Sequence, residues 1–396
     1  MDTRHLQIRK RTLLLSALLA SACSDGFVPP ADAVTPPRAA LTDARGLRWE
    51  LRRHVDEFAA EEPRAPENVE ARADGLPWPQ LSNDDAVSRL RPIALTPDNH
   101  EYTLSDRDAL AFVQQLRELA PRLPRSAPMG VPDAAQVSER TGRVLSEDRF
   151  ARKTFGEDDR ANVNDEADQV PWRFIAAMAN AGECTAFKLL NPQTALTAAH
   201  CVHDGVEWHR RKTLQFAAGA SERRAELDAD CYSIIVPAAW DGEDAEFDFA
   251  VLRLREEGLD GGASCERAAY DIGHFGYNLV DECVDGIALT LAGYPSRKDP
   301  DHPVPVGDWS YPSLFTDYRT DGWSACAGLY PSALFFYNDG SNGQSGSPVW
   351  SFYQDSGQNQ VRGIHRGSMI TVIGDSNRAR RFDDSLMAWF TLNAGY

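Results

Sequence analysis

The sequence predicts an all-β protein from about residue 154 to its end, with a closing helix and a mainly helical region ahead of it. Beyond residue 154, short apolar runs alternate with Gly, Pro, Asn and Asp, which is typical of strands joined by turns. Upstream, apolar residues recur at helical spacing in two segments. The first 22 residues instead have the polarity of an export signal.

Residues 1–23 are predicted to be a signal peptide. A cationic start precedes the run Leu13–Ala22, in which only two serines are polar. Ten residues are too few to span a hydrocarbon core of about 30 Å, so this run does not predict a transmembrane helix. We therefore expect the protein to be exported.

The residues before Cys23 fit two kinds of signal-peptide cleavage site. The run Leu19-Ala20-Ser21-Ala22 before it fits an ordinary small-residue cleavage site and also a lipoprotein box, although alanine stands where that box usually has leucine. Removing Cys23 from the seven cysteines leaves six, an even number that suits an oxidising compartment. This parity favours lipidation of Cys23, and the expected location is the periplasm, the cell envelope or the medium.

Residues 24–153 are predicted to form a tether followed by a helical region. Residues 24–45 are rich in Pro, Ala and Asp and have no apolar period, as expected of a flexible tether. One amphipathic helix is predicted from a spacing of three to four residues in the set Leu47, Leu51, Val55 and Phe58.

A second helix is predicted to begin after Ser105, with Asp108 completing the capping signal, and to end at Pro121. Further prolines then mark a linker, and five basic residues follow it between Arg140 and Lys153. Exposed basic bonds of this kind are sites where proteolytic processing is expected.

Residues 154–396 form the predicted β domain. Its apolar runs are 171–178, 185–190, 233–236, 248–254, 287–292 and 334–337. The tail 383–392 has Leu386, Trp389 and Phe390 on one helical face, which predicts the closing helix. This domain holds 36 of the 59 acidic and 19 of the 41 basic residues. So acidic a surface argues against nucleic acid or an anionic membrane as partner.

Three short motifs carry residues that suit nucleophilic catalysis. Gly343-Gln344-Ser345-Gly346 places a serine in a glycine turn, where backbone N–H groups can converge on an oxyanion. His200 ends the run 196–200 and supplies a base, and Asp248 starts a buried-looking strand. The order His, Asp, Ser is that of the chymotrypsin-type triad.

With these motifs in place, the chain resembles the chymotrypsin-fold serine endopeptidases, most closely the bacterial glutamyl endopeptidase (V8-like) branch. The likeness covers roughly residues 154–396. Besides the three motifs it includes the segments 156–160, 182–185, 292–295 and Gly363-Ile364-His365. The resemblance implies two six-stranded antiparallel barrels with the cleft between them, a C-terminal helix, and an N-terminal pro-region that masks the cleft or assists folding. A small helical domain of unknown purpose is the alternative for that region.

The resemblance also implies the roles of the site residues. His200 is the general base and acid, Asp248 orients it, Ser345 attacks, and the backbone N–H groups of Gly343 and Ser345 hold the oxyanion. No cofactor is expected. A metal site at His200 and His203 is not predicted either, because no cysteine or carboxylate cluster completes it.

The resemblance pairs Cys184 with Cys201 around the catalytic histidine. For the other four cysteines the sequence allows three connectivities. We expect Cys265 with Cys283, which lie 18 residues apart, and Cys231 with Cys326.

Specificity is predicted from three positions around the expected primary pocket. In the glutamyl branch a histidine at the place of His365 binds the substrate carboxylate, and here Ser341 is available as a second donor. Asp339 stands six residues before Ser345, where trypsin-like enzymes keep the carboxylate that pairs with lysine or arginine, and a carboxylate in the pocket would repel glutamate. The orientation we favour is the other one, in which Asp339 points away and caps a turn, because His365 would otherwise be unexplained as a pocket residue.

The sequence as a whole predicts an exported serine endopeptidase that acts on proteins or peptides through an acyl-enzyme, with cleavage after Glu. Two alternatives stay open. One is the same mechanism with cleavage after Lys or Arg, and the other is a catalytically inactive protease-like binding protein. The expected partners are peptide substrates, the protein's own pro-region and, through Cys23, a membrane lipid anchor.

Overall fold

The computed structural model describes residues 38–59, 78–131, 160–179, 184–217, 225–254, 265, 272–281, 284–295, 314–324, 332–338, 340, 343–353, 357–371 and 374–394. The predicted signal peptide, Cys23, most of the tether, the basic stretch 140–153 and the boundary at residue 154 lie outside these ranges. Among the described residues, no helix is both long and apolar enough to cross a membrane.

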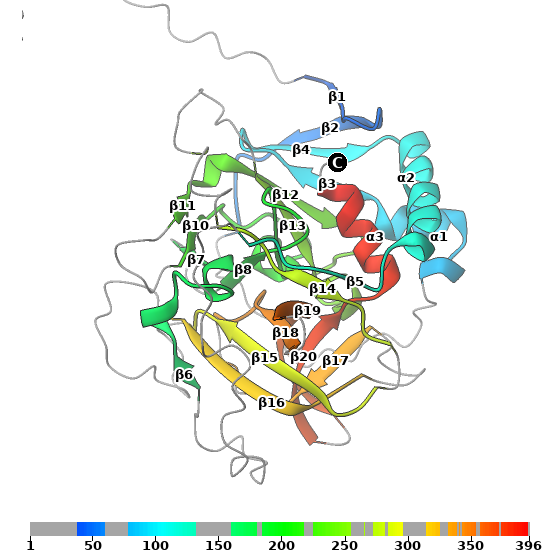
Figure 1. Cartoon of the computed structure of the whole chain (residues 1–396). Coiled ribbons are helices and arrows are strands. Elements are labelled where there is room, and N and C mark those ends of the chain that lie inside the picture. Colours follow the sequence, from blue (N-terminus) through cyan, green and yellow to red (C-terminus); the bar gives the residue numbers. More distant parts are fainter. Residues whose placement is uncertain are drawn as a thin grey trace, which may run out of the picture. The chain divides into compact units, whose positions relative to one another are not determined.

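The first sheet has eleven strands, all antiparallel to their neighbours, and it joins the N-terminal region to the predicted protease domain (Figure 1). In sheet order the strands are β1 (Ala40–Thr42), β2 (Arg48–His54), β4 (His100–Leu104), β3 (Pro92–Leu95), β12 (Tyr232–Pro237), β13 (Ala250–Leu254), β9 (Thr194–Thr197), β8 (Cys184–Lys188), β7 (Ile175–Ala179), β10 (Thr213–Phe216) and β11 (Ala225–Leu227). The junction is the pair β3–β12, where Leu95 lies opposite Ile234.

The second sheet contains a closed barrel of six strands. These are β18 (Pro348–Tyr353), β15 (Ile287–Gly293), β16 (Phe315–Ser324), β17 (Ala333–Phe336), β20 (Gly374–Arg381) and β19 (Gln358–Thr371), and the barrel closes because β18 pairs with both β15 and β19. Three short strands add to it: β14 (Gly276–Asn278) beside β19, β5 (Ser126–Ala127) beside β14, and β6 (Ala161–Asn162) beside β16. One of the two predicted barrels is therefore confirmed, whereas the described strands of the first sheet do not close.

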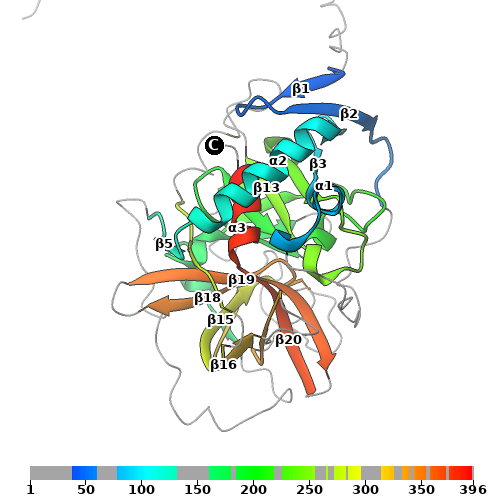
Figure 2. The same cartoon turned by 90° about the vertical axis from the view of Figure 1, so that its right-hand side faces the viewer.

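Three α-helices accompany the sheets in the described part of the chain, and each begins at a polar cap. They are α1 (Asn83–Leu90), α2 (Asp106–Leu119) and α3 (Asp384–Asn393), capped by Ser82, Ser105 and Asp383. The side chain of each cap accepts a backbone N–H from the first turn, which satisfies a donor that has no partner within the helix. α2 and α3 are the predicted second and closing helices, and they lie side by side (Figure 2).

The prediction of a helix over Leu47–Phe58 is wrong, because most of this segment, Arg48–His54, forms the strand β2 and none of it is helical. Leu47, Leu51 and Val55 are four residues apart, and four is a multiple of the two-residue period of a strand as well as close to a helical turn. Trp49 decides between the two periods. Leu47 and Trp49 are buried, whereas Arg48 and Glu50, which follow each of them in the sequence, are exposed. Burial therefore alternates from one residue to the next, as it does in a strand.

The N-terminal region is a mixture of strands and helices rather than mainly helical, and it shares one hydrophobic core with the sheet that follows it. Two tryptophans bond across this junction. Trp389 Nε1 of α3 donates to the Leu90 carbonyl oxygen at 2.9 Å, and Trp208 Nε1 donates to Glu101 Oε2 at 2.8 Å. Folding of this region is therefore not separate from folding of the first sheet.

Two disulfides are described. Cys184 pairs with Cys201 as expected, whereas Cys231 pairs with Cys265, which overturns the expected pairs Cys265–Cys283 and Cys231–Cys326. The sheet explains the difference, because Tyr232 lies opposite Leu254 and the chain that leaves β13 thus starts beside Cys231. Cys283 and Cys326 lie outside the described residues.

Candidate active site

His200 and Asp248 meet because their strands are neighbours in the first sheet. His200 belongs to a 3₁₀ turn, Ala199–Cys201, directly after β9, and Asp248 ends another, Ala245–Phe247, directly before β13. The two strands run antiparallel with Thr197 opposite Ala250, so the end of β9 lies beside the start of β13. Sequence positions 48 residues apart are thereby brought into contact.

Asp248 holds His200 at two points. Its Oδ2 lies 2.8 Å from the ring Nδ1 of His200, and its Oδ1 accepts the backbone N–H of His200 at 2.9 Å. The exposed fractions of the two side chains are 0% for Asp248 and 3% for His200. The other ring nitrogen, Nε2, is buried and has no hydrogen-bond partner among the described residues. The ring is thus fixed through Nδ1, while Nε2 is free to accept a proton.

Arg366 is a third member of this cluster, and the sequence reasoning missed it. Its Nε donates to Asp248 Oδ2 at 2.6 Å, and its side chain is 2% exposed. Burial by itself would raise the pKa of the Asp248 carboxyl, but the Arg366 guanidinium and His200 outweigh it and hold that pKa well below its usual value. The one signal in the sequence was the position of Arg366 directly after His365.

Ser345 lies in a tight turn between β17 and β18, with 7% of its surface exposed. Gly343 and Gly346 on either side have φ angles of 90° and 83°, a region that favours glycine. A Cβ on Gly346 would also come within 2.2 Å of the Thr185 carbonyl oxygen. Glycine is therefore required at position 346 by both conformation and space.

Backbone hydrogen bonds fix this turn against both sheets. Thr185 N–H donates to the Ser345 carbonyl oxygen at 2.7 Å, and Gly346 N–H donates to that of His365 at 2.8 Å. Cys201, the neighbour of His200, has its Sγ 3.6 Å from the Ser345 carbonyl oxygen. The structure therefore brings the serine turn against the histidine segment, although no hydrogen bond joins Ser345 Oγ to His200 Nε2.

The N–H groups of Gly343 and Ser345 donate no hydrogen bond to any described residue. Both groups are therefore available to an outside acceptor. This availability is what the predicted oxyanion hole requires.

His365 lies on β19 with 1% of its surface exposed, next to the serine turn. Burial, followed by the charge of His200, lowers the pKa of His365 to about 3, so its ring is neutral near pH 7. Its Nδ1 has no partner among the described residues. A Cβ on Gly340 would lie 3.4 Å from His365 Nε2 and 3.1 Å from Asn377 Nδ2, so position 340 lies close to both side chains. Asp339 and Ser341 lie outside the described residues.

Cys184, His200 and Cys201 form the group of potential metal ligands found in the described part of the chain. The two cysteines are joined in a disulfide, so neither offers the thiolate that binds a metal. His203 is not part of this group, and burial lowers its pKa to about 4.

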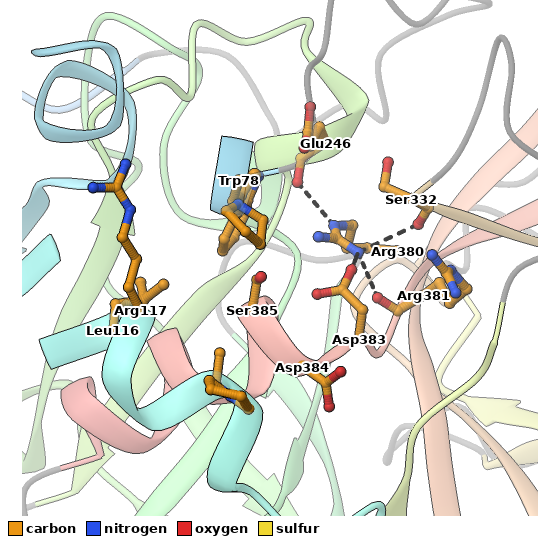
Figure 3. Close-up of a pocket in the computed structure, with 13 residues that line it drawn as sticks. Trp78, Leu116, Arg117, Glu246, Ser332, Arg380, Arg381, Asp383, Asp384 and Ser385 are labelled. Carbon is orange, nitrogen blue, oxygen red and sulfur yellow. Dashed lines mark hydrogen bonds and ion pairs between the residues drawn. The ribbon is translucent and has the colours of Figure 1, made fainter. Parts of the chain in front are cut away.

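The N-terminal region supports the Asp248 segment from one side. Trp78 stacks on Phe247 with parallel rings 5.9 Å apart and also contacts the ring of Phe249. Beside it, Arg380 donates to the carbonyl oxygen of Glu246 and to Asp383, in a cavity of about 440 Å³ that holds no triad residue (Figure 3). The residues on both sides of Asp248 thus pack against a segment more than 160 residues earlier in the chain.

Comparison with solved structures gives weak likenesses. A Glu endopeptidase solved in complex with MPD has a TM-score of 0.44 and 18% identity, covering 61% of this chain and 99% of its own. A thermostable serine protease, AL20, from an extremophilic microorganism has a TM-score of 0.37 and 17% identity, covering 56% of this chain and 94% of its own. Both TM-scores are below 0.5, so neither likeness carries weight here.

Comparison by sequence is more informative. Residues 161–273 match the family model described as trypsin. The glutamyl endopeptidase of Bacillus licheniformis is 25% identical over 216 residues, which are 54% of this chain and 58% of that relative. The match therefore spans less than two thirds of the relative's length. Together these comparisons confirm the resemblance predicted from the sequence: the chain carries a trypsin-like domain and has a glutamyl endopeptidase among its relatives.

Proposed function

We propose that the protein is a serine endopeptidase in which Ser345, His200 and Asp248 form the catalytic triad. The observation that carries the proposal is the fixed His200 ring, with Asp248 on Nδ1 and an unpartnered Nε2, beside a serine held in a glycine turn. Geometry of this kind, rather than sequence position, identifies a triad. In free enzymes the bond between base and nucleophile is often long and tightens when substrate binds.

The proposed reaction proceeds through an ester. Ser345 Oγ bonds to the carbonyl carbon of the substrate while its proton moves to His200 Nε2, and the N–H groups of Gly343 and Ser345 stabilise the oxyanion. The peptide C–N bond then breaks, and the leaving amine takes the proton from His200. Water then attacks the ester carbonyl while His200 Nε2 takes its proton, the bond from the carbonyl carbon to Ser345 Oγ breaks, and His200 returns the proton to Ser345 Oγ as the carboxylic acid product leaves.

Fluorophosphonate labelling tests this proposal without knowledge of the substrate. The folded protein is expected to take up one phosphonyl group on Ser345, located by peptide mass spectrometry, and to take up none after heat denaturation. A catalytically inactive binding protein of the same fold would stay unlabelled. Folded, processed protein that never labels would therefore favour that alternative over the endopeptidase.

We further propose that the enzyme cleaves after glutamate and that His365 lies in the primary pocket. The glutamyl endopeptidase name of the curated relative supports this, as do the neutral, buried ring of His365 and its unpartnered Nδ1. A neutral imidazole can donate one hydrogen bond to a carboxylate. Cleavage after Lys or Arg, through Asp339, is the second candidate.

Profiling on a peptide library separates the two specificities. With His365→Ala, kcat/KM for glutamyl substrates is expected to fall by on the order of 10²–10³, because a hydrogen-bonding site loses its partner for the substrate. Asp339→Asn is the matched variant and is expected to leave glutamyl cleavage unchanged. A preference for basic residues that disappears in Asp339→Asn would contradict the glutamyl assignment.

Export, lipidation of Cys23 and processing within the basic stretch 140–153 remain part of the proposal. The described disulfides support an oxidising compartment. The contacts of Trp78 and β3 with the first sheet favour the folding role of the N-terminal region over masking of the cleft.

A further inference from the structure

Arg366 reaches Asp248 from a β-bulge. On β19 and β20, His365 lies opposite Ala379 and Gly367 lies opposite Arg378, so Arg366 is an extra residue without a cross-strand partner. A bulge redirects a side chain, and bulges are frequent next to active sites. Here the redirected side chain places Nε 2.6 Å from Asp248 Oδ2 and is buried.

The Asp248 carboxylate receives three hydrogen bonds from two separate elements. His200 supplies two of them, through Nδ1 and its backbone N–H, and Arg366 supplies the third. The strand that carries Arg366 also bonds the serine turn, because the His365 carbonyl oxygen accepts the N–H of Gly346. β19 therefore fixes both the turn of the nucleophile and the carboxylate behind the base.

The Arg366 guanidinium forms its ion pair with Asp248. Its Nη1 and Nη2 are buried without a hydrogen-bond partner among the described residues, so Asp248 is the counter-ion it contacts there. A carboxylate favours the protonated form of a neighbouring imidazole, and a cation beside that carboxylate offsets this effect. Arg366 thus acts on His200 through Asp248.

The segments packed around His200 carry three further ionisable side chains, those of His209, Lys212 and His365. His209 and His365 interact electrostatically with it, and burial lowers their pKa values to about 4 and about 3, so both are neutral above about pH 5. Lys212 Nζ donates to the Cys201 carbonyl oxygen at 3.3 Å. Of the described side chains that contact Asp248, only Arg366 brings a permanent positive charge.

We propose that Arg366 is a positioning residue that fixes the Asp248 carboxylate and offsets the charge that this carboxylate presents to His200. This inference rests on the proposed triad. It assigns to Arg366 a role in the pH range of activity as well as in structure.

The test is the pH dependence of the fluorophosphonate labelling rate between about pH 5 and 9, which needs no knowledge of the substrate. In Arg366→Gln and Arg366→Met the acid limb of the profile is expected to move to higher pH by about one unit, because the whole charge of Asp248 then acts on His200. Arg366→Lys keeps the charge and is expected to keep the limb within about 0.3 unit of the wild type. Two neutral variants are used in case the glutamine variant does not fold. Methionine fills a volume similar to that of arginine without a charge, so Arg366→Met is the second neutral variant.

Arg362→Gln is the matched control, since Arg362 is on the same strand and donates to Ser351 and Asn278 instead of Asp248. Its acid limb is expected to coincide with that of the wild type. Wild-type labelling together with unshifted limbs in both neutral variants would overturn the role of Arg366 alone. A wild type that neither labels nor hydrolyses peptides would overturn the triad and this inference together.

Discussion

Replacing Ser345 by alanine is expected to abolish peptide hydrolysis, with a fall in kcat on the order of 10⁴–10⁶. The acyl-enzyme cannot form without the hydroxyl oxygen, so only water attack assisted by the remaining pocket would persist. The fold is expected to survive, because the turn is held by backbone groups. Thr185 N–H donates to the Ser345 carbonyl oxygen, and alanine keeps that oxygen.

The measurement is hydrolysis of a cleavable peptide by processed wild type and variant at equal concentration, with circular dichroism to compare their folds. Ser351→Ala is a suitable control, since Ser351 is a buried serine on the adjoining strand whose hydroxyl donates to the Ala288 carbonyl oxygen. It is expected to cost some stability and little activity. Activity near that of the wild type in Ser345→Ala would remove Ser345 from the mechanism.

The sequence predicted correctly those helices whose capping residue or apolar spacing fits a helix and no other element. The Ser105 cap and the following apolar face identified α2, and the face of Leu386, Trp389 and Phe390 identified α3. The prediction for Leu47–Phe58 failed because a spacing of four suits a strand as well as a helix, and the prediction left out Trp49, which makes apolar and charged residues alternate as in a strand.

The candidate site divides in the same way. The glycines around Ser345 and the run before His200 can be recognised in the sequence, because the proposed catalytic chemistry restricts which residue types can stand beside Ser345 and His200. Arg366 cannot, because its importance comes from a bulge that only the pairing of β19 with β20 defines. The pair Cys231–Cys265 likewise depends on a tertiary feature, since the register of β12 on β13 places the end of β13 beside Cys231, and no spacing of cysteines encodes that register.

The N-terminal region differs most from expectation. A removable mask would be expected to pack on its own core, whereas β3 extends the first sheet and Trp78 packs on Phe247 beside Asp248. Burial of such surface would be lost if this region left the fold. One hydrophobic core includes residues on both sides of the predicted boundary at residue 154.

Replacing Asp248 by asparagine is expected to lower kcat at neutral pH by on the order of 10⁴, because an amide cannot hold His200 in the tautomer that leaves Nε2 unprotonated. Arg366 adds a second consequence. Its guanidinium is 2% exposed and would lose the counter-ion it contacts, and removing one partner of a buried ion pair costs about 3–5 kcal/mol in free energy of unfolding.

Urea unfolding of the Asp248→Asn variant, measured in a Ser345→Ala background to prevent autolysis, tests the second consequence. The double change Asp248→Asn with Arg366→Gln removes both charges and is expected to regain most of the lost stability while staying inactive. Because the pKa of Asp248 in the folded state is below its unfolded value, the stability it provides is present above about pH 4 and disappears only as pH falls through that lowered pKa. The difference from the wild type should therefore hold from pH 7 down to about pH 4. If Asp248→Asn and the wild type were equally stable across that range, the buried Arg366 guanidinium would not need Asp248 as its counter-ion. Full activity of Asp248→Asn would exclude Asp248 from the triad.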